Sequence, residues 1–142
     1  MALVVDAGAL YAQADVDEPS HGAIARLLLS EHEPLVTTEL AVAEADYLIL
    51  ARLGIDVELA FLEDLAAGTY SVECLTRAEL QLARNVGVRY RDLRLGLADA
   101  SLVVLALRYR TKRILTFDDR AFRTVEPLQG GSFVVLPADA AM

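Results

Sequence analysis

The sequence predicts an α/β fold in which a central, mainly parallel sheet is flanked by helices on both faces. Short apolar runs alternate along the chain with segments of helical length, which is the pattern of a parallel sheet with helical crossovers. The first of these runs, "ALVVD", shows no polar alternation, so both faces of that strand are expected to be buried. With 142 residues, of which 55% are hydrophobic, the chain can bury one large core, and we predict a single domain over residues 1–142.

The expected strands are short runs rich in β-branched and aromatic side chains. The first is "ALVVD", and the last, "FVVL", follows a Gly-Gly turn. The predicted strands occupy residues 2–6, 34–37, 70–75, 113–117 and 133–136.

Three helices are expected in the first half of the chain. Residues 19–31 form the first, which opens with a proline, a residue suited to the first helical turn. Thr38 is expected to cap the second, which runs to about Leu53. Asp56 is expected to cap the third, and Gly68 to end it.

Three further helices are expected in the second half. The segment "TRAE" matches a capping box, in which Thr76 and Glu79 begin a helix that runs to about Tyr90. After an arginine-rich connection, residues 97–109 form an almost wholly apolar helix. A short helix begins near Asp119, directly after the fourth strand.

The charge of the chain is distributed unevenly. The net charge is −8, which by itself disfavours a polyanionic partner. Residues 1–75 hold 14 acidic and two basic side chains, a net −12, whereas residues 76–142 hold seven acidic and 11 basic ones, a net +4. This asymmetry indicates either a polyanion-binding surface in the second half or two solvated faces of opposite sign.

The composition favours a soluble protein of a reducing cytoplasm. The longest apolar runs are far shorter than the roughly 18 residues of a membrane span, and the N-terminus lacks the pattern of a signal peptide. The one cysteine, Cys74, cannot form an internal disulfide and is interpreted as a small buried residue.

Two aspartates follow predicted strands. Asp6 comes directly after the first strand, and Asp118 comes directly after the fourth. The carboxyl ends of parallel strands share one edge of the sheet, where ligands bind in folds of this class. If the two strands are neighbours, these carboxylates lie at the same edge.

Two more carboxylates lie in apolar helices. On the helix after Thr38, a helical wheel places Glu44 within an apolar stripe, and Asp46 is the competing choice if the phase of the helix differs. Asp99 lies in the almost wholly apolar helix of residues 97–109. Buried charges of this kind need a partner.

Each of the four carboxylates also has a structural interpretation, as a helix cap, a turn residue or the partner of a buried arginine. As a group, however, they repel one another by about 1 kcal/mol per pair at about 4 Å in water, and by more in a dry cleft. A divalent cation relieves this repulsion. Oxygen ligands favour Mg²⁺ or Mn²⁺, and neither the distant pair His21 and His32 nor the single Cys74 can build a zinc site. Such a metal centre suits phosphodiester hydrolysis.

Four acidic segments resemble, in order, those of the PIN-domain ribonucleases: "LVVDAGAL", "TTELAVAEADYLI", "GLADASLVVLA" and "ILTFDDRAF". The length is similar to that of the VapC toxins of bacterial type II toxin–antitoxin modules. The resemblance implies a PIN domain whose metal-binding and catalytic residues are Asp6, Glu44, Asp99 and Asp118. It also implies that Thr116 orients the site, with Asp119 auxiliary or merely a helix cap.

The residues after Asp6 differ from those of the PIN domains that this chain resembles and from those of other folds. PIN domains commonly carry Ser or Thr directly after the first aspartate, whereas this chain has Ala7 and Gly8, so one supporting hydroxyl is absent. A receiver domain needs an acidic pair after the first strand, and a haloacid-dehalogenase-like phosphatase needs D-x-D there. The sequence disfavours both classes.

The resemblance implies a Mg²⁺-dependent endoribonuclease, with Mn²⁺ as the alternative metal. It would cleave a cellular RNA, either tRNA or rRNA, and inhibit translation. It would form a homodimer and be neutralised by a VapB-type antitoxin. The alternative is a non-catalytic PIN-like module that only binds RNA or protein.

Basic residues in the second half are candidate RNA contacts. Arg89, Arg91 and Arg94 lie close together around the arginine-rich connection, and we expect them to contact RNA phosphates. A solvated helix face is the structural alternative.

Overall fold

The computed structural model describes residues 1–141, apart from the side chains of Asp119 and Ala141. Its centre is a five-stranded sheet of order β3-β2-β1-β4-β5 in which every pairing is parallel. The strands are β1 (Leu3–Val5), β2 (Leu35–Thr38), β3 (Ser71–Glu73), β4 (Arg113–Leu115) and β5 (Val134–Leu136). The predicted strands and the parallel α/β class are therefore confirmed.

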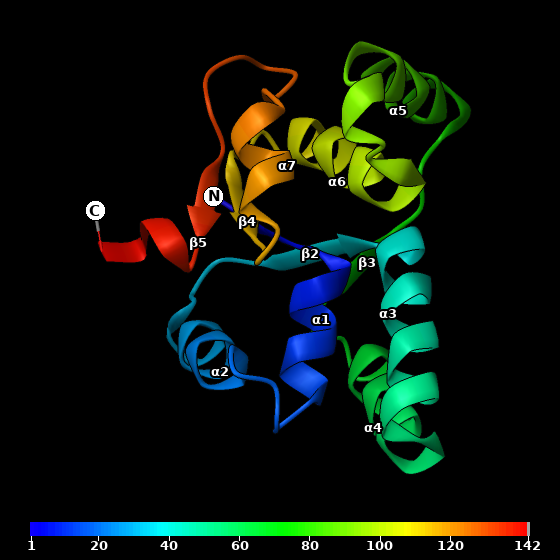
Figure 1. Ribbon diagram of the computed structural model, residues 1–142, viewed down its shortest axis with the longest axis vertical. Coiled ribbons are helices and arrows are strands. Elements are labelled where there is room, and N and C mark those ends of the chain that lie inside the picture. Colours follow the sequence, from blue (N-terminus) through cyan, green and yellow to red (C-terminus); the bar gives the residue numbers. More distant parts are fainter. Residues whose placement is uncertain (142) are drawn as a thin grey trace.

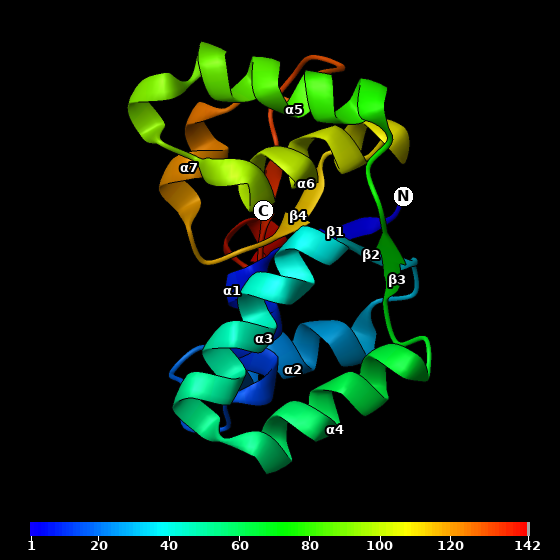
Figure 2. The same cartoon turned by 90° about the vertical axis from the view of Figure 1, so that its right-hand side faces the viewer.

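Helices cover both faces of the sheet (Figures 1 and 2), with α1–α4 on one side and α5–α7 on the other. The helices are α1 (Ala7–Ala14), α2 (His21–Ser30), α3 (Glu39–Leu53), α4 (Ile55–Ala66), α5 (Arg77–Arg89), α6 (Gly96–Arg108) and α7 (Asp119–Thr124). Short 3₁₀ turns occupy Arg91–Leu93 and Ala138–Ala141. Within residues 1–141, no helix is both long and apolar enough to cross a bilayer.

The uneven charge of the sequence becomes a difference between the two helical layers. The acidic half of the chain, residues 1–75, supplies α1–α4, and the basic half supplies α5–α7. Since these two sets of helices lie on opposite sides of the sheet (Figure 2), the layer of α1–α4 is acidic and the other carries most of the arginines.

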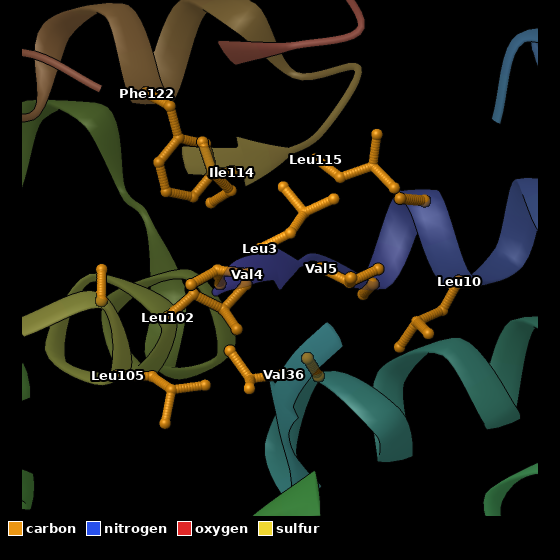
Figure 3. Close-up of a cluster of buried hydrophobic side chains, with 14 of the residues drawn as sticks. Leu3, Val4, Val5, Leu10, Val36, Leu102, Leu105, Ile114, Leu115 and Phe122 are labelled. Atoms are coloured by element: carbon orange, nitrogen blue, oxygen red, sulfur yellow. The ribbon is translucent and has the colours of Figure 1, made fainter. Parts of the chain in front are cut away.

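The core is centred on β1. Leu3, Val4 and Val5 are at most 1% exposed, which explains why this strand shows no polar alternation. Leu102 and Leu105 of α6 are wholly buried against the sheet (Figure 3). Burying a side chain of this size stabilises a fold by roughly 1.5–3 kcal/mol, so this apolar centre holds the strand ends in place.

The sequence reasoning missed α1. This helix consists mostly of alanine and small residues that are buried on more than one side, so it lacks the amphipathic period that marks a surface helix. Its start is nevertheless encoded, because the Asp6 side chain accepts a hydrogen bond from the Ala9 amide at 2.8 Å.

The predicted cap of α4 was wrong. The N-cap is Gly54, whose φ of 91° lies in the left-handed region that glycine adopts readily. Asp56 lies instead in the first turn of α4, where its negative charge interacts favourably with the helix dipole.

The capping box of α5 is confirmed. The Thr76 hydroxyl accepts a hydrogen bond from the Glu79 amide at 3.1 Å, and the Glu79 carboxylate accepts one from the Thr76 amide at 3.0 Å. Arg108, at the end of α6, donates to the same Glu79 carboxylate at 2.9 Å. The start of α5 is therefore fixed to the end of α6.

Candidate active site

The carboxyl ends of β1 and β4 bring Asp6 and Asp118 to one edge of the sheet. The two strands are neighbours, with Val5 opposite Leu115, and the Asp6 amide donates to the Leu115 carbonyl at 3.2 Å. The expectation that both aspartates follow adjacent parallel strands therefore holds in the structure.

Asp6 is 5% exposed and lies in the interior of this edge. Burial raises its pKa to about 7, against the opposing effect of hydrogen bonds from the Thr116 hydroxyl and the Ala9 amide. The negative charges of Asp99 and Asp118 raise the same pKa further. Asp6 therefore belongs to an electrostatically coupled group of carboxylates.

Thr116 links Asp6 to the loop that carries Asp118. Its side chain is buried, bonds to Asp6, and accepts a hydrogen bond from the Asp118 amide at 2.9 Å. These are the contacts that an orienting residue requires. They also give Asp6 a hydroxyl partner from β4, although Ala7 and Gly8 supply none.

Asp99 lies in the first turn of α6, half-buried. Burial raises its pKa to about 6, and the charges of Glu44 and then Asp118 add to this effect. The N-cap of α6 is Leu95, so Asp99 is not the cap of its helix. The structural interpretation of Asp99 as a cap is therefore excluded.

The buried face of α3 differs from the predicted one. It consists of Ala41, Ala45 and Ile49, whereas Glu44 is exposed on the helix surface. The helical wheel predicted the wrong buried face because α3 is apolar on nearly all sides and has no unique apolar stripe. Glu44 nevertheless lies near Asp99, whose pKa it raises.

Asp46, the alternative to Glu44, faces a different neighbour. Its carboxyl group lies against Glu58 of α4 and raises the pKa of Glu58 by hydrogen bonding. The structure therefore brings Glu44, and not Asp46, toward the other carboxylates.

Asp118 stands at the N-cap position of α7, and its exposed side chain makes no capping hydrogen bond to the described residues. It is therefore available to a ligand. Asp119 is the first residue of α7, and its side chain lies outside the described part of the chain, as does the predicted auxiliary role.

A cleft of about 230 Å³ opens beside these carboxylates. Two acidic and two basic side chains line it together with small and apolar ones: Leu93, Arg94, Leu95, Asp99, Asp118, Arg120 and Ala121. None of the ion pairs found among the described residues involves either arginine. Cations that face the cleft next to carboxylates suit an anionic ligand bridged by a metal ion.

The sequence reasoning missed Arg120. The available signal was its position, directly after Asp118 and Asp119 and thus in the first turn of α7. Of the three predicted RNA contacts, the structure brings only Arg94 to the cleft. Arg89 instead pairs with Glu126 at 3.4 Å, and Arg91 lies exposed at the start of a 3₁₀ turn.

The carboxylates fit a hard divalent cation. Within the described residues, the predicted four carboxylates included, no group of three or more carboxylate, imidazole or thiolate side chains lies close enough together to hold a metal ion. Mg²⁺ does not need such a group, because it is commonly held by one or two carboxylates and keeps several waters. Asp99 and Asp118 line one cleft, and the repulsion that raises the pKa of Asp99 is what a cation would relieve.

Comparisons with known proteins agree with this geometry. The PIN domain family model matches residues 3–127. Ribonuclease VapC26 of Mycobacterium tuberculosis is 43% identical over 135 residues, which are 95% of this chain and 100% of that protein.

Two solved structures share the fold. The crystal structure of VapC20 of Mycobacterium tuberculosis, a toxin that cleaves the Sarcin-Ricin loop, has a TM-score of 0.77 at 20% identity and covers 82% of this chain and 90% of that one. VapBC2 from Rickettsia felis, bound to a DNA fragment from its promoter, has a TM-score of 0.66 at 9% identity and covers 95% and 97%.

Proposed function

The chain belongs to the PIN domain family, and on this premise we propose that it is a VapC-type toxin, a Mg²⁺-dependent endoribonuclease that inhibits translation. Mn²⁺ is expected to replace Mg²⁺ in vitro. The proposal is supported by Asp6 and Asp118, which follow neighbouring strands, and by the electrostatic effects that link Asp6, Asp99 and Asp118 and that link Glu44 to Asp99.

The carboxylates divide into two groups by burial. Asp99 and Asp118 face the cleft and would hold the metal directly. Asp6 lies behind them, where Thr116 and the start of α1 fix its orientation. Glu44 completes the set from α3. The bound ion would supply an activated water and neutralise charge on the phosphoryl group.

The RNA is expected on the side of the basic helices. Arg94 and Arg120 line the cleft and would hold phosphate oxygens next to the carboxylates. Arg89, which pairs with Glu126, and Arg91 are exposed and would contact flanking phosphates. The proposed substrate is a tRNA or an rRNA, and the rRNA option is supported by the fold shared with a toxin that cleaves the Sarcin-Ricin loop.

The acidic layer suits a protein partner. Tyr47 and Leu50 of α3 and Ile55 and Leu59 of α4 are 44–73% exposed, on the layer whose sequence carries a net charge of −12. A basic, amphipathic segment of a VapB-type antitoxin would complement this surface. We propose that the protein is homodimeric, acts in the cytoplasm and is inhibited by such an antitoxin.

A matched pair of variants on one helix tests the proposal. Glu44→Gln should abolish Mg²⁺-dependent cleavage of RNA and weaken the heat of Mn²⁺ binding measured by calorimetry. Asp46→Asn, two residues away but facing α4, should change neither.

Asp99→Asn gives an independent check from α6, with the same expected losses. A non-catalytic binding module predicts a different result, in which RNA binds without cleavage and no heat of Mn²⁺ binding depends on Glu44 or Asp99. That result would refute the enzyme assignment.

A further inference from the structure

We propose that two buried hydroxyl groups, those of Thr38 and Ser101, act as positioning residues that set the separation of Glu44 and Asp99. This inference rests on the proposed function, because it assigns these carboxylates to one metal centre. It concerns buried residues that do not line the cleft.

The two hydroxyls join the helices that carry these carboxylates. The Thr38 and Ser101 oxygens lie 2.8 Å apart, and both residues are 0% exposed. Thr38 also accepts a hydrogen bond from the Ala41 amide at 3.1 Å, and Ser101 donates to the Ala98 carbonyl at 2.6 Å. A continuous hydrogen-bonded chain therefore runs from the first turn of α3 to the first turn of α6.

The donor and acceptor in each of these hydrogen bonds are determined by the groups at the two ends of the series. Ser101 has one hydroxyl proton, which it gives to the Ala98 carbonyl, an oxygen that can only accept. The proton between the two hydroxyls must therefore come from Thr38. Thr38 in turn uses a lone pair to accept from the Ala41 amide. Every buried donor in the chain has an acceptor, so the arrangement has one stable orientation.

Each end of this series of hydrogen bonds fixes the backbone of a helix that carries one of the two carboxylates. The Ala98 carbonyl belongs to the peptide group that leads into Asp99, so Ser101 fixes the backbone from which that side chain projects. Thr38 is the N-cap of α3 and fixes the first turn of this helix. Glu44 lies six residues later, about 9 Å along the helix axis. α3 and α6 pack against each other, so the two fixed helix starts set how far apart Glu44 and Asp99 lie.

A purely structural role predicts a different dependence on the hydroxyls. Two apolar groups of the same shape commonly replace a buried hydrogen-bonded pair with little loss of stability. A positioning role requires the hydroxyls themselves, because only the directional bonds hold the two helix starts in register. Stability and metal affinity should therefore respond differently to the same variants.

The test measures Mn²⁺ affinity of the full chain by calorimetry. Ser101→Ala and Thr38→Val should each weaken Mn²⁺ binding about 10-fold, the lower range for residues that support metal ligands. Thr38→Ser keeps the hydroxyl and should restore binding. In cleavage assays kcat should fall, whereas KM for RNA should not change, because the cleft arginines are untouched.

Thr111→Val is the matched control. Thr111 is also 0% exposed, and its hydroxyl donates to the Ala2 carbonyl at 2.6 Å, but it lies before β4, at the opposite edge of the sheet. This variant should destabilise the fold without changing Mn²⁺ affinity.

The outcomes separate the inference from the proposed function. If the wild type binds Mn²⁺ and Ser101→Ala binds it equally well, the positioning role is wrong and the metal centre stands. The double variant Thr38→Val/Ser101→Ala still lacks the capping bond to the Ala41 amide, but it should lose less stability than the two single variants together and still bind weakly. Recovery of affinity in this variant would also refute the inference. A wild type that binds no Mn²⁺ contradicts both proposals.

Discussion

Asp6 combines two roles with opposite electrostatic requirements. As the cap of α1, its carboxylate accepts a hydrogen bond from the Ala9 amide, and this bond favours the charged form. As a buried member of the carboxylate group it is driven toward the protonated form, and this effect is the larger, since its pKa rises to about 7. In metal-free protein the ionised form of the Asp6 carboxyl group is therefore destabilised.

The first prediction concerns the pH dependence of stability in metal-free buffer. The folded pKa of Asp6 is about 7, above its ordinary value of 3.8, so the folded state binds the proton more tightly than the unfolded state. The resulting stabilisation is full below about pH 4 and is lost as the pH rises through about 7. Urea unfolding at a series of pH values should show this decline.

Asp6→Asn removes the titration and keeps a good capping residue. We expect this variant to exceed the wild type in free energy of unfolding at pH 8 by roughly 2–4 kcal/mol, and to show a flatter pH dependence. Equal stability of the two proteins at pH 8 would contradict the electrostatic account of this site.

The second prediction concerns the two arginines of the cleft. Replacing Arg94 or Arg120 with Ala should weaken RNA binding and reduce the slope of log affinity against log salt by about one for each lost phosphate contact. Binding is measured in EDTA, so that cleavage does not interfere. Arg26 is an exposed residue of α2 in the acidic layer, so Arg26→Ala is the control and should leave the slope unchanged.

At the scale of the element, side-chain capping fixes the starts of α1, α3 and α5. The capping box of α5 and its tie to Arg108 connect this helix to the end of α6, whereas the site lies at the start of α6. The third prediction is that Thr76→Ala lowers the free energy of unfolding by about 1 kcal/mol and leaves Mn²⁺ affinity intact. A large loss of metal binding would show that α5 also supports the site.

The contact of α3 with α4 contains two carboxyl groups, Asp46 and Glu58. Hydrogen bonding to Asp46 raises the pKa of Glu58 above its ordinary value of 4.5, so this contact is most stable in acid and weakens as the pH rises through the raised value. The fourth prediction is that Asp46→Asn raises the melting temperature at pH 7.5 and has little effect at pH 4. The reverse order would contradict the shared hydrogen bond.

At the scale of the whole molecule, metal binding and folding are coupled. An ion that binds only the folded state stabilises it by about 2.7 kcal/mol at a concentration 100 times its dissociation constant. The fifth prediction is that Mn²⁺ raises the melting temperature of the wild type and that EDTA reverses the shift. Asp99→Asn should show no such shift, and an equal shift in this variant would place the ion elsewhere.

The sequence predicted the strands well, because continuous apolar runs with flanking turn signals reflect burial on both faces. It missed α1, since a short alanine-rich helix buried on several sides has no amphipathic period. It also misjudged the buried face of α3 for the same reason, although Glu44, which it chose over Asp46, is the residue whose charge acts on Asp99. Hydrophobic periodicity does not predict which face of a helix is buried when the helix is apolar on all sides.

What the sequence determined by itself is local: the order of strands and helices, the capping box of α5, and the aspartates that follow β1 and β4. What only the tertiary structure decided is which distant groups meet. The strand order places Asp6 beside Asp118, the packing of α3 on α6 brings Glu44 to Asp99, and α7 turns Arg120 into the cleft. The physical reason is that capping and burial periods act over a few residues, whereas these distances are set by how whole elements pack against one core.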